Sequence, residues 1–450
     1  MIRWTLVALA GLSLGAPPLV APDSAPVAPA ADSTSGQLHA LIDAAHGASP
    51  LVCGLAARNI GNGWGWGGDA PVTPLPRIER VRSHEHRAPL SNPDVAFLAG
   101  NLDASDPCVQ EIAVRMLAQE ETEQAVRALT DRLTATDSST RLAAALGLGL
   151  MQPPSAVEPL LRAIQDRAGS VRANAVWALG RIGDGRAVRP ATARLGDQDD
   201  LVREAAAGAL GHLDSASAIP ALTRLLAHDP VARVRRVAAW ALAELDAKSA
   251  RDALTAALSG DGNAIVREMC AWAIGELGDG QAPAALIKAA ADDGDEQVRE
   301  TAVWALGEIG DAAAADQLGK VLRADRSVRV RRTAAWTLGQ LDLRSAPDGL
   351  LDALGDSDRE LRLTAAWTLS QIGDVRALPQ LRAALAKESD AGARKAEIRA
   401  LIHSGERTER LTELLDSQDP AVREAAIRGI ARHGGVDPWP WPQPRPRPFP

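Results

Sequence analysis

Arginine and aspartate carry most of the capacity for acid–base chemistry in this chain, and both recur at a fixed interval. In one recurring motif, successive arginines are almost always 31 or 32 residues apart, and in seven successive copies an aspartate lies six residues before the arginine. The arginines are Arg141, Arg172, Arg203, Arg235, Arg267, Arg299, Arg331, Arg362, Arg394 and Arg423. The aspartates are Asp166, Asp197, Asp229, Asp261, Asp293, Asp325 and Asp356. Paired carboxylates can act as general acid and base, but catalysis needs one unique site. Because these residues are as periodic as the chain, we predict that they are structural.

The other candidate chemistry is a possible metal site at His84, Glu85 and His86. Alternation would place both imidazoles on one side of a strand, where they could bind a metal. No third ligand stands nearby, so a solvated loop is the favoured interpretation. The sequence shows no Ser/His/Asp constellation, phosphate loop or CxxC pair, and we predict no catalytic residue, metal or cofactor. The net charge of −8 gives no reason to expect nucleic acid as a partner.

The interval itself predicts the architecture. Each arginine lies in a version of V-R-x-x-A-A-x-A-L-G, as at residues 202–211. A repeat of this length indicates one helical unit stacked many times, which is a solenoid. Counting one helix pair for Gln110 and one for each of the ten arginines gives eleven pairs. Each pair has an A helix, a turn and a B helix that carries the arginine. Gly-Asp follows several B helices, as at Gly183 and Asp184, where glycine suits a left-handed helix end and aspartate caps the next helix.

The motif resembles the HEAT repeats of the phycobilisome-lyase (PBS lyase) type. The resemblance is carried by V-R-x-x-A-A-x-A-L-G-x-I-G-D at residues 171–184 and 298–311 and covers about 340 residues. It implies an all-α, right-handed α-solenoid, a HEAT/armadillo-like superhelix whose B helices line the inner curve. It also implies a ladder of hydrogen bonds in which the repeated aspartates and arginines join neighbouring units.

The activities of this family do not transfer with the fold. It includes lyase subunits, a hydroxylase and plain scaffolds, and its iron-binding hydroxylases carry His-Glu pairs at the starts of several helices. Here those positions read Val-Arg-Glu, Val-Arg-Arg or Val-Arg-Ala. Export from the cytoplasm would also separate the chain from bilin chemistry.

Tryptophan marks the candidate binding face. With the arginine as position zero, apolar residues recur at −1, +3, +7 and +10 on one helical stripe, and position +5 lies about 200° from +3. We therefore expect position +5 on the side opposite the buried face. The tryptophans at +5 are Trp177, Trp240, Trp272, Trp304, Trp336 and Trp367, and the repeat of Arg203 has Gly208 there. Glutamates at +1 and +9 flank the row: Glu268, Glu276, Glu300 and Glu308.

Two interpretations of this row stay open. Each tryptophan could cover the alanine-rich backbone of a neighbouring B helix, or the row could bind a partner, because tryptophan is favoured at interface anchors. The two roles are compatible.

The ends of the chain predict export. Residues 1–30 form a candidate signal peptide with a basic start and an apolar stretch of about a dozen residues, too short to span a bilayer. Residues 31–91 are a linker and a small N-terminal segment, 92–435 the solenoid, and 436–450 a Pro-rich tail. The tail is a spacer or a docking segment in polyproline-II geometry.

The cysteines bear on the same question. Cys53 and Cys108 either pair in an oxidising compartment or remain free thiols, and Cys270 is a buried thiol. We expect a periplasmic or extracellular protein, possibly tethered by an uncleaved N-terminal segment, with no other membrane span.

The function expected from these features is a non-enzymatic scaffold. Its inner B-helix face would bind a protein or an extended peptide. The alternatives are an enzyme or enzyme accessory of the HEAT-like lyase or hydroxylase group, and a mechanical spacer.

Overall fold

The computed structural model describes residues 33–49, 53, 90–120, 122–278 and 280–431. Within these residues the chain forms α-helices and short 3-10 turns, and the helices after α1 (Ser33–Ala45) pair in sequence. The pairs are α3(Asn92–Asn101)/α4(Pro107–Leu117), α5(Glu123–Arg132)/α6(Ser138–Met151), α7(Val157–Ala163)/α8(Gly169–Ile182), α9(Val188–Arg194)/α10(Asp200–His212), α11(Ile219–His228)/α12(Ala232–Glu244), α13(Arg251–Gly260)/α14(Ala264–Leu277), α15(Ala284–Asp292)/α16(Glu296–Ile309), α17(Ala315–Ala324)/α18(Val328–Gln340), α19(Asp348–Asp352)/α20(Arg359–Ile372), α21(Leu378–Leu385)/α22(Ala391–His403) and α23(Thr408–Glu413)/α24(Pro420–Ile430). These are the eleven pairs predicted from the arginine spacing, and the all-α solenoid is confirmed.

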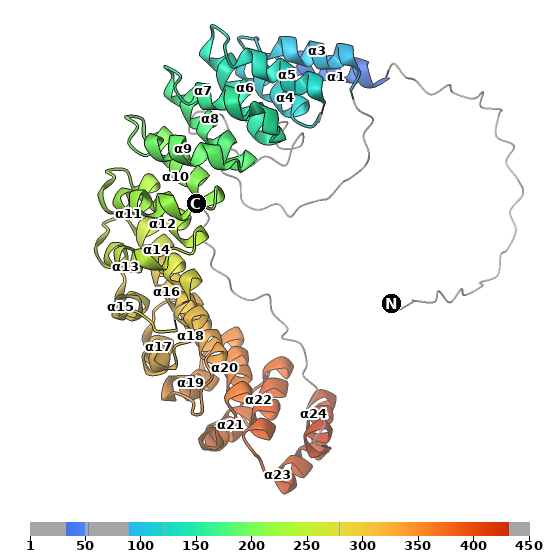
Figure 1. Cartoon of the computed structure of the whole chain (residues 1–450). Helices are drawn as coiled ribbons and strands as arrows, with labels where there is room; N and C mark the ends of the chain where they lie inside the picture. The colour runs from blue at the N-terminus through green and yellow to red at the C-terminus, as the bar shows by residue number, and fades with distance from the viewer. Residues whose placement is uncertain (1–32, 50–52, 54–89, 121, 279, 432–450) are drawn as a thin grey trace, which may run out of the picture.

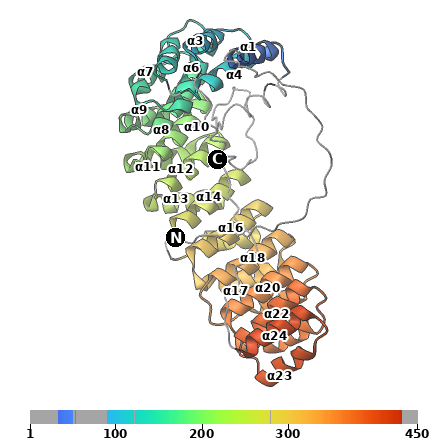
Figure 2. The ribbon, with the colours of Figure 1, turned by 90° about the vertical axis from the view of Figure 1, so that its right-hand side faces the viewer.

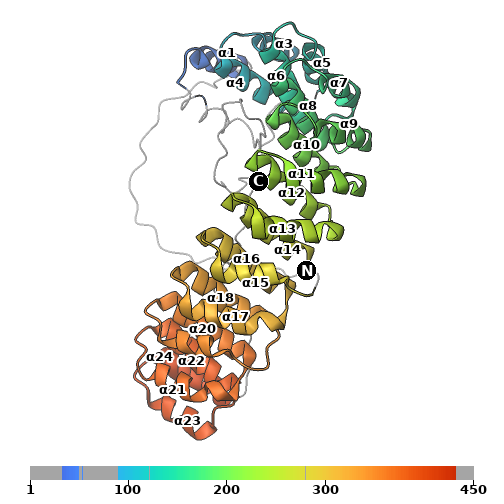
Figure 3. The same cartoon turned by 90° about the vertical axis from the view of Figure 1, so that its left-hand side faces the viewer.

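The pairs stack in single file into a curved rod. A helices such as α11, α13 and α15 form the outer side, and B helices such as α12, α14 and α16 line the inner curve (Figure 1). Views from the two sides show the same order of pairs from α3/α4 to α23/α24 (Figures 2 and 3). Because the stack is curved, the B helices lie along its concave side.

Local sequence signals set the ends of the B helices. Asp295 is the N-cap of α16 and accepts hydrogen bonds from the backbone N–H groups of Gln297 and Val298. Gly310 ends α16 with φ 74°, a left-handed conformation that glycine adopts without strain. Asp311 then accepts from the N–H of Ala313 and starts the 3-10 turn before α17. The predicted Gly-Asp punctuation therefore works as a helix stop followed by a cap.

The core runs unbroken along the stack, between the A and B layers. Val298, Ala302 and Leu306 of α16 are fully buried, as are Leu286 of α15 and Leu318 of α17. Small alanines on the B helices let neighbouring units approach closely, and each unit buries its apolar face only through its neighbours.

The N-terminal helix α1 covers the open end of the first pair. Its Leu38 and Ile42 are buried, and the Ser35 hydroxyl donates to Asp94 at 2.6 Å. The imidazole of His39 stacks on Phe97 with ring centroids 3.7 Å apart. This helix begins at Ser33, within residues 31–91, for which the sequence predicted a linker and a small N-terminal segment.

A disulfide joins Cys53 to Cys108 of α4, with their Cα atoms 5.5 Å apart. The free Cys270 is buried in α14, and burial raises the pKa of its thiol far above the ordinary value. The candidate signal peptide, residues 84–86 and the Pro-rich tail lie outside the described residues. No helix within the described ranges is both long and apolar enough to cross a membrane.

Candidate binding surface

The repeated arginines and aspartates join successive units. Arg172 donates from Nε and Nη2 to Asp197 of the next repeat, at 2.9 and 2.6 Å, and from Nη1 to the backbone carbonyl of Asp166 at 2.9 Å. The same pairing holds for Arg141–Asp166, Arg203–Asp229, Arg235–Asp261, Arg267–Asp293, Arg299–Asp325 and Arg331–Asp356. The ladder implied by the family resemblance is therefore present, and its charged groups pair with one another within the fold.

The ladder changes chemistry at its two ends. Glu388 takes the place of aspartate opposite Arg362, with Nε to Oε2 at 2.6 Å, and Asp419 pairs with Arg394 at 3.3 Å. In the first pair, the Gln110 side-chain amide instead donates to the Leu102 carbonyl at 3.0 Å.

Burial alone would raise the pKa of Asp197. Hydrogen bonds from Arg172 and from the Asp199 backbone N–H outweigh burial and hold this pKa below the ordinary value. A carboxylate that stays ionised and fully paired is a structural group rather than a general base.

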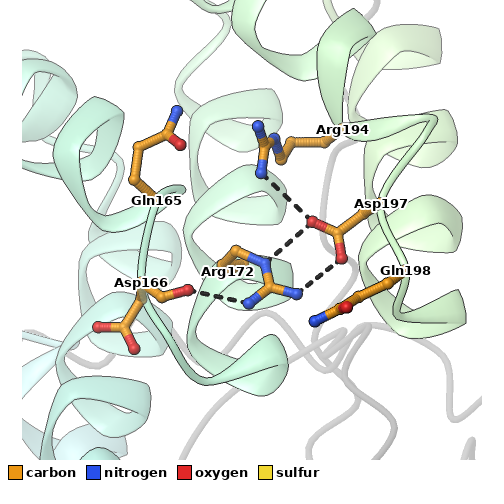
Figure 4. A pocket seen from close by; sticks show the side chains of 6 residues that line it. All are labelled: Gln165, Asp166, Arg172, Arg194, Asp197 and Gln198. Carbon is orange, nitrogen blue, oxygen red and sulfur yellow. Dashed lines mark hydrogen bonds and ion pairs between the residues drawn. The ribbon is translucent and has the colours of Figure 1, made fainter.

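A shallow pocket of about 350 Å³ lies on this ladder. Figure 4 shows the Arg172 guanidinium at its centre, between the Asp166 carbonyl and the Asp197 carboxylate, with Arg194 also on Asp197. Gln165 and Gln198 complete the lining. Since its central charges pair with one another, the pocket belongs to the structural ladder. Within the described ranges, no group of three or more His, Cys, Asp or Glu side chains could hold a metal ion.

The tryptophans at position +5 are largely buried. This finding corrects the expectation that position +5 lies on the side of the B helix opposite its buried face. Trp304 is 3% exposed, and Trp240, the most exposed of the five buried ones, is 9% exposed. Trp177, Trp272 and Trp336 are also buried, and Trp367 is half-buried.

The physical reason is lateral packing. A periodicity argument separates a helix into two faces, but a B helix in a stack contacts an A helix and both neighbouring B helices. Position +5 faces the preceding B helix, and the rings of Trp177, Trp240, Trp304 and Trp367 lie against a glycine at position +8 of that helix. A Cβ built on Gly211 would lie 2.8 Å from the Trp240 ring, and one on Gly275 would lie 3.3 Å from the Trp304 ring. The tryptophans therefore pack between neighbouring B helices, as the first of the two interpretations describes. We call this layer of tryptophans at position +5 the tryptophan floor.

The interruption at Gly208 has a visible consequence. With no tryptophan at +5 in α10, the helices α8 and α10 approach each other directly. A Cβ on Gly180 of α8 would lie 2.6 Å from the Ala209 Cα of α10. Beside Trp304 the approach is somewhat less close, since a Cβ on Gly275 would lie 3.0 Å from the Ala305 Cα.

Carboxylates stand on this floor in two rows. Glu276 and Glu308, at position +9 in α14 and α16, are exposed, while Glu268 is half-buried and Glu300 is buried at position +1. We call Glu268, Glu276, Glu300 and Glu308 the acidic strip. Glu244 of α12 extends its exposed row.

The two rows of the strip differ in their electrostatics. Burial raises the pKa of Glu268 and of Glu300, although Arg329 donates to Glu300 at 2.6 Å. Glu308 forms no ion pair with any residue that the structure describes. Glu308 is therefore the carboxylate of the strip most able to bind a cation from outside.

Two inner-face residues escaped the sequence analysis although they share position +9. His212 makes an edge-on ring contact with Trp240, with centroids 5.1 Å apart, and the Arg181 guanidinium lies 5.9 Å from the Trp177 ring centroid. Burial lowers the pKa of His212, and the charge of Arg181 lowers it further. A comparison of position +9 across all the repeats would have identified both residues. At position +9, Arg181 and His212 therefore precede the glutamates of α12, α14 and α16 along the rod.

Two buried donors on the floor remain unsatisfied. Among the described residues, the indole N–H groups of Trp272 and Trp304 have no hydrogen-bond partner. An unpaired buried donor costs about 1–3 kcal/mol, so the floor is less stable than its packing alone suggests.

These features define a class of protein: an α-solenoid scaffold with a continuous inner surface. The family model for HEAT repeats matches residues 95–172, 157–243, 251–329 and 315–402, and the model for the PBS lyase HEAT-like repeat matches residues 234–260. The chain belongs to the HEAT-repeat family, and the resemblance stated from its motif is confirmed. No curated protein shows a significant sequence match.

Solved structures share the fold. Importin beta, crystallised in an ammonium sulfate condition, is 13% identical with a TM-score of 0.53, over 76% of this chain and 58% of that chain. Kap95p, studied for its binding to RanGDP, is 15% identical with a TM-score of 0.50, over 75% of this chain and 57% of that chain. This chain thus matches under two thirds of either length. At such identities the likeness concerns the fold alone.

Proposed function

We propose that this protein is a non-enzymatic binding scaffold whose acidic strip binds a basic protein segment or extended peptide. The carrying observation is the placement of exposed carboxylates on a rigid, tryptophan-packed floor along the inner curve. Lysine or arginine side chains of a partner would meet Glu276 and Glu308, and neighbouring carboxylates strengthen that attraction. Importin beta and Kap95p support the proposal only through the shared solenoid form.

We further propose that the protein works outside the cytoplasm. The disulfide between Cys53 and Cys108 supports this location, because such bonds persist in oxidising compartments. The predicted signal peptide at residues 1–30 points the same way. Fractionation of cells that express the full chain, with N-terminal sequencing of the product, tests both export and cleavage.

The binding test compares two variants of equal charge change. Glu276→Gln/Glu308→Gln neutralises the exposed row on the inner curve. Asp252→Asn/Asp316→Asn removes the same two charges from exposed positions on the outer helices α13 and α17. Affinity capture from a cell-envelope extract should lose the partner with the inner variant, by roughly tenfold for two exposed ion pairs, and keep it with the outer one. Equal capture by all three proteins would refute the strip as the binding site.

A cross-linking experiment locates the contact. A photo-reactive amino acid at Gln340, exposed on the inner row of α18, should capture the partner. The same group at Lys320, exposed on α17, is the matched outer position and should capture little.

A further inference from the structure

We infer that the Pro-rich C-terminal segment of this chain, residues 437–450, binds along the acidic strip of the same molecule. The inference rests on the proposed function, since it takes the inner face as the binding surface and names one ligand for it. The segment lies outside the described residues, so the argument uses its sequence and the surface that the structure describes. Its sequence after Asp437 is P-W-P-W-P-Q-P-R-P-R-P-F-P.

The first ground is charge complementarity. Beyond Asp437, the only charged side chains of the segment are Arg445 and Arg447. The exposed row of the strip offers carboxylates at Glu276 and Glu308, and Glu308 has no ion-pair partner among the described residues. Arginine is the cation best suited to such pairing, because its planar fork binds a carboxylate through two parallel hydrogen bonds.

The second ground is the backbone chemistry of the segment. Proline at every second position fixes φ and removes half of the N–H donors, so the segment cannot extend the solenoid as another helix. An extended polyproline-II chain is already ordered, so it loses little entropy when it lies in a groove beside aromatic residues. The inner curve presents the exposed glutamates of the strip to such a chain, while most of its tryptophans are buried.

The third ground is where the segment starts. The described chain ends just after α24, whose last residue is Ile430, and α24 closes the row of B helices at one end (Figure 1). Position +9 lies in the last turn of each B helix, as Glu308 does in α16. Because the B helices repeat the same direction, the described chain ends at the edge along which the exposed carboxylates are arranged.

The fourth ground is reach. Arg445 is 15 residues beyond Ile430, and an extended chain of that length spans at most about 50 Å. The helix α16 lies four B-helix steps from α24 and α14 lies five, or roughly 32–50 Å at about 8–10 Å per step. Arg445 and Arg447 can therefore reach Glu308 and Glu276 in the same molecule.

The consequence is an intramolecular competitor. A segment held by two exposed ion pairs occupies the strip weakly, and a partner with more positive charge displaces it. Its binding should weaken as salt rises, because exposed charges are screened within about 10 Å at 0.1 M.

The test uses the full-length chain with a photo-reactive p-benzoylphenylalanine at Gln443, between the tryptophans and the arginines of the segment. After irradiation, mass spectrometry should find cross-links within one chain to α14, α16 or α18. Their yield should fall about fivefold or more in Glu276→Gln/Glu308→Gln and in Arg445→Gln/Arg447→Gln. The outer variant Asp252→Asn/Asp316→Asn should retain it.

Three outcomes would overturn the inference. The first is cross-links between two chains, which would mean that a second copy supplies the segment. The second is cross-links confined to the outer helices. The third is a cross-link yield that stays unchanged in Glu276→Gln/Glu308→Gln. Partner capture by the same proteins separates this failure from failure of the proposed function. If capture depends on Glu276 and Glu308 while the cross-link does not, only the tail contact is wrong. If the tail binds in cis, Arg445→Gln/Arg447→Gln should capture more partner than wild type.

Discussion

At the residue scale, the indole rings of the B helices have a packing role that explains their burial. Four of the six rings at position +5 lie against a glycine of the preceding helix, as Trp304 does against Gly275. A role in binding would then come through the stiffness of the floor and through ring edges, while the charges beside it select the ligand.

Trp304→Ala should destabilise the central units by about 3–5 kcal/mol, the usual cost of deleting a large buried aromatic side chain. Trp304→Phe keeps an aromatic ring and removes the unpaired indole N–H, so its cost should be clearly smaller. Urea unfolding followed by circular dichroism measures both. Equal losses for the two variants would contradict the packing role described here.

Glu397 is a second residue whose environment conflicts with its chemistry. It occupies position +3 of α22, where Ala302 stands in α16, and it is fully buried. Neither carboxyl oxygen has a hydrogen-bond partner. Burial and then the charge of Glu388 raise its pKa to about 8, against the opposing effect of Arg362 and Arg394.

This shift predicts a pH dependence at the C-terminal end of the solenoid. Between the ordinary pKa of 4.5 and about 8, the folded state holds a proton on Glu397 that the unfolded state releases. Stability should therefore fall as pH rises through this window, by at most about 1.4 kcal/mol per pH unit. Hydrogen exchange of α22 and α24 at pH 5, 6.5 and 8 measures the slope. Glu397→Gln, which cannot ionise, should flatten it, and an unchanged slope in this variant would assign the dependence to another group.

At the element scale, glycine at position +8 controls how closely two B helices approach. This role appears most directly between α8 and α10, where no tryptophan intervenes. A Cβ on Gly180 would meet the backbone of Ala209 at 2.6 Å, and backbone cannot rotate away as a side-chain end can.

Gly180→Ala should destabilise the protein by about 1–3 kcal/mol through overpacking, despite a helix-propensity gain of nearly 1 kcal/mol. Gly260→Ala at the end of α13 is the control, since a Cβ there meets nothing within 4 Å. That variant should be neutral or slightly stabilising. Chemical unfolding of both variants decides the matter, and a stabilised Gly180→Ala would show that the helices separate at little cost.

At the scale of the whole molecule, stability is a sum over neighbours, because each unit contacts only the next. The ladder of arginine and aspartate ties every central rung to its successor, and α1 with the disulfide closes the N-terminal end. Damage at one end should therefore stay near that end.

Reduction of the Cys53–Cys108 disulfide tests this locality. The bond closes a sequence separation of 55 residues, for which the chain-entropy model gives roughly 4 kcal/mol of stabilisation. With reductant, hydrogen exchange should accelerate in α1 and α4 while α14 and α16 keep their protection. Uniform loss of protection along the rod would mean that the solenoid unfolds as one cooperative unit.

The sequence by itself determined the unit and its number. The spacing of arginines such as Arg172 and Arg203, the Gly-Asp punctuation at Gly310 and Asp311, and the apolar positions before and after the arginine are local signals. Each acts within one turn or one helix, so the eleven pairs could be counted and the ladder recognised as structural.

Only the tertiary structure decided which surfaces remain available. The burial of Trp304 depends on a glycine about thirty residues earlier in the sequence, and a helical wheel drawn for one B helix contains no neighbour. The same holds for Glu397, which is buried near the charges of Glu388, Arg362 and Arg394. Burial in a stack is a property of the contacts between units, and those contacts separate the exposed carboxylates of Glu276 and Glu308 from the tryptophans beneath them.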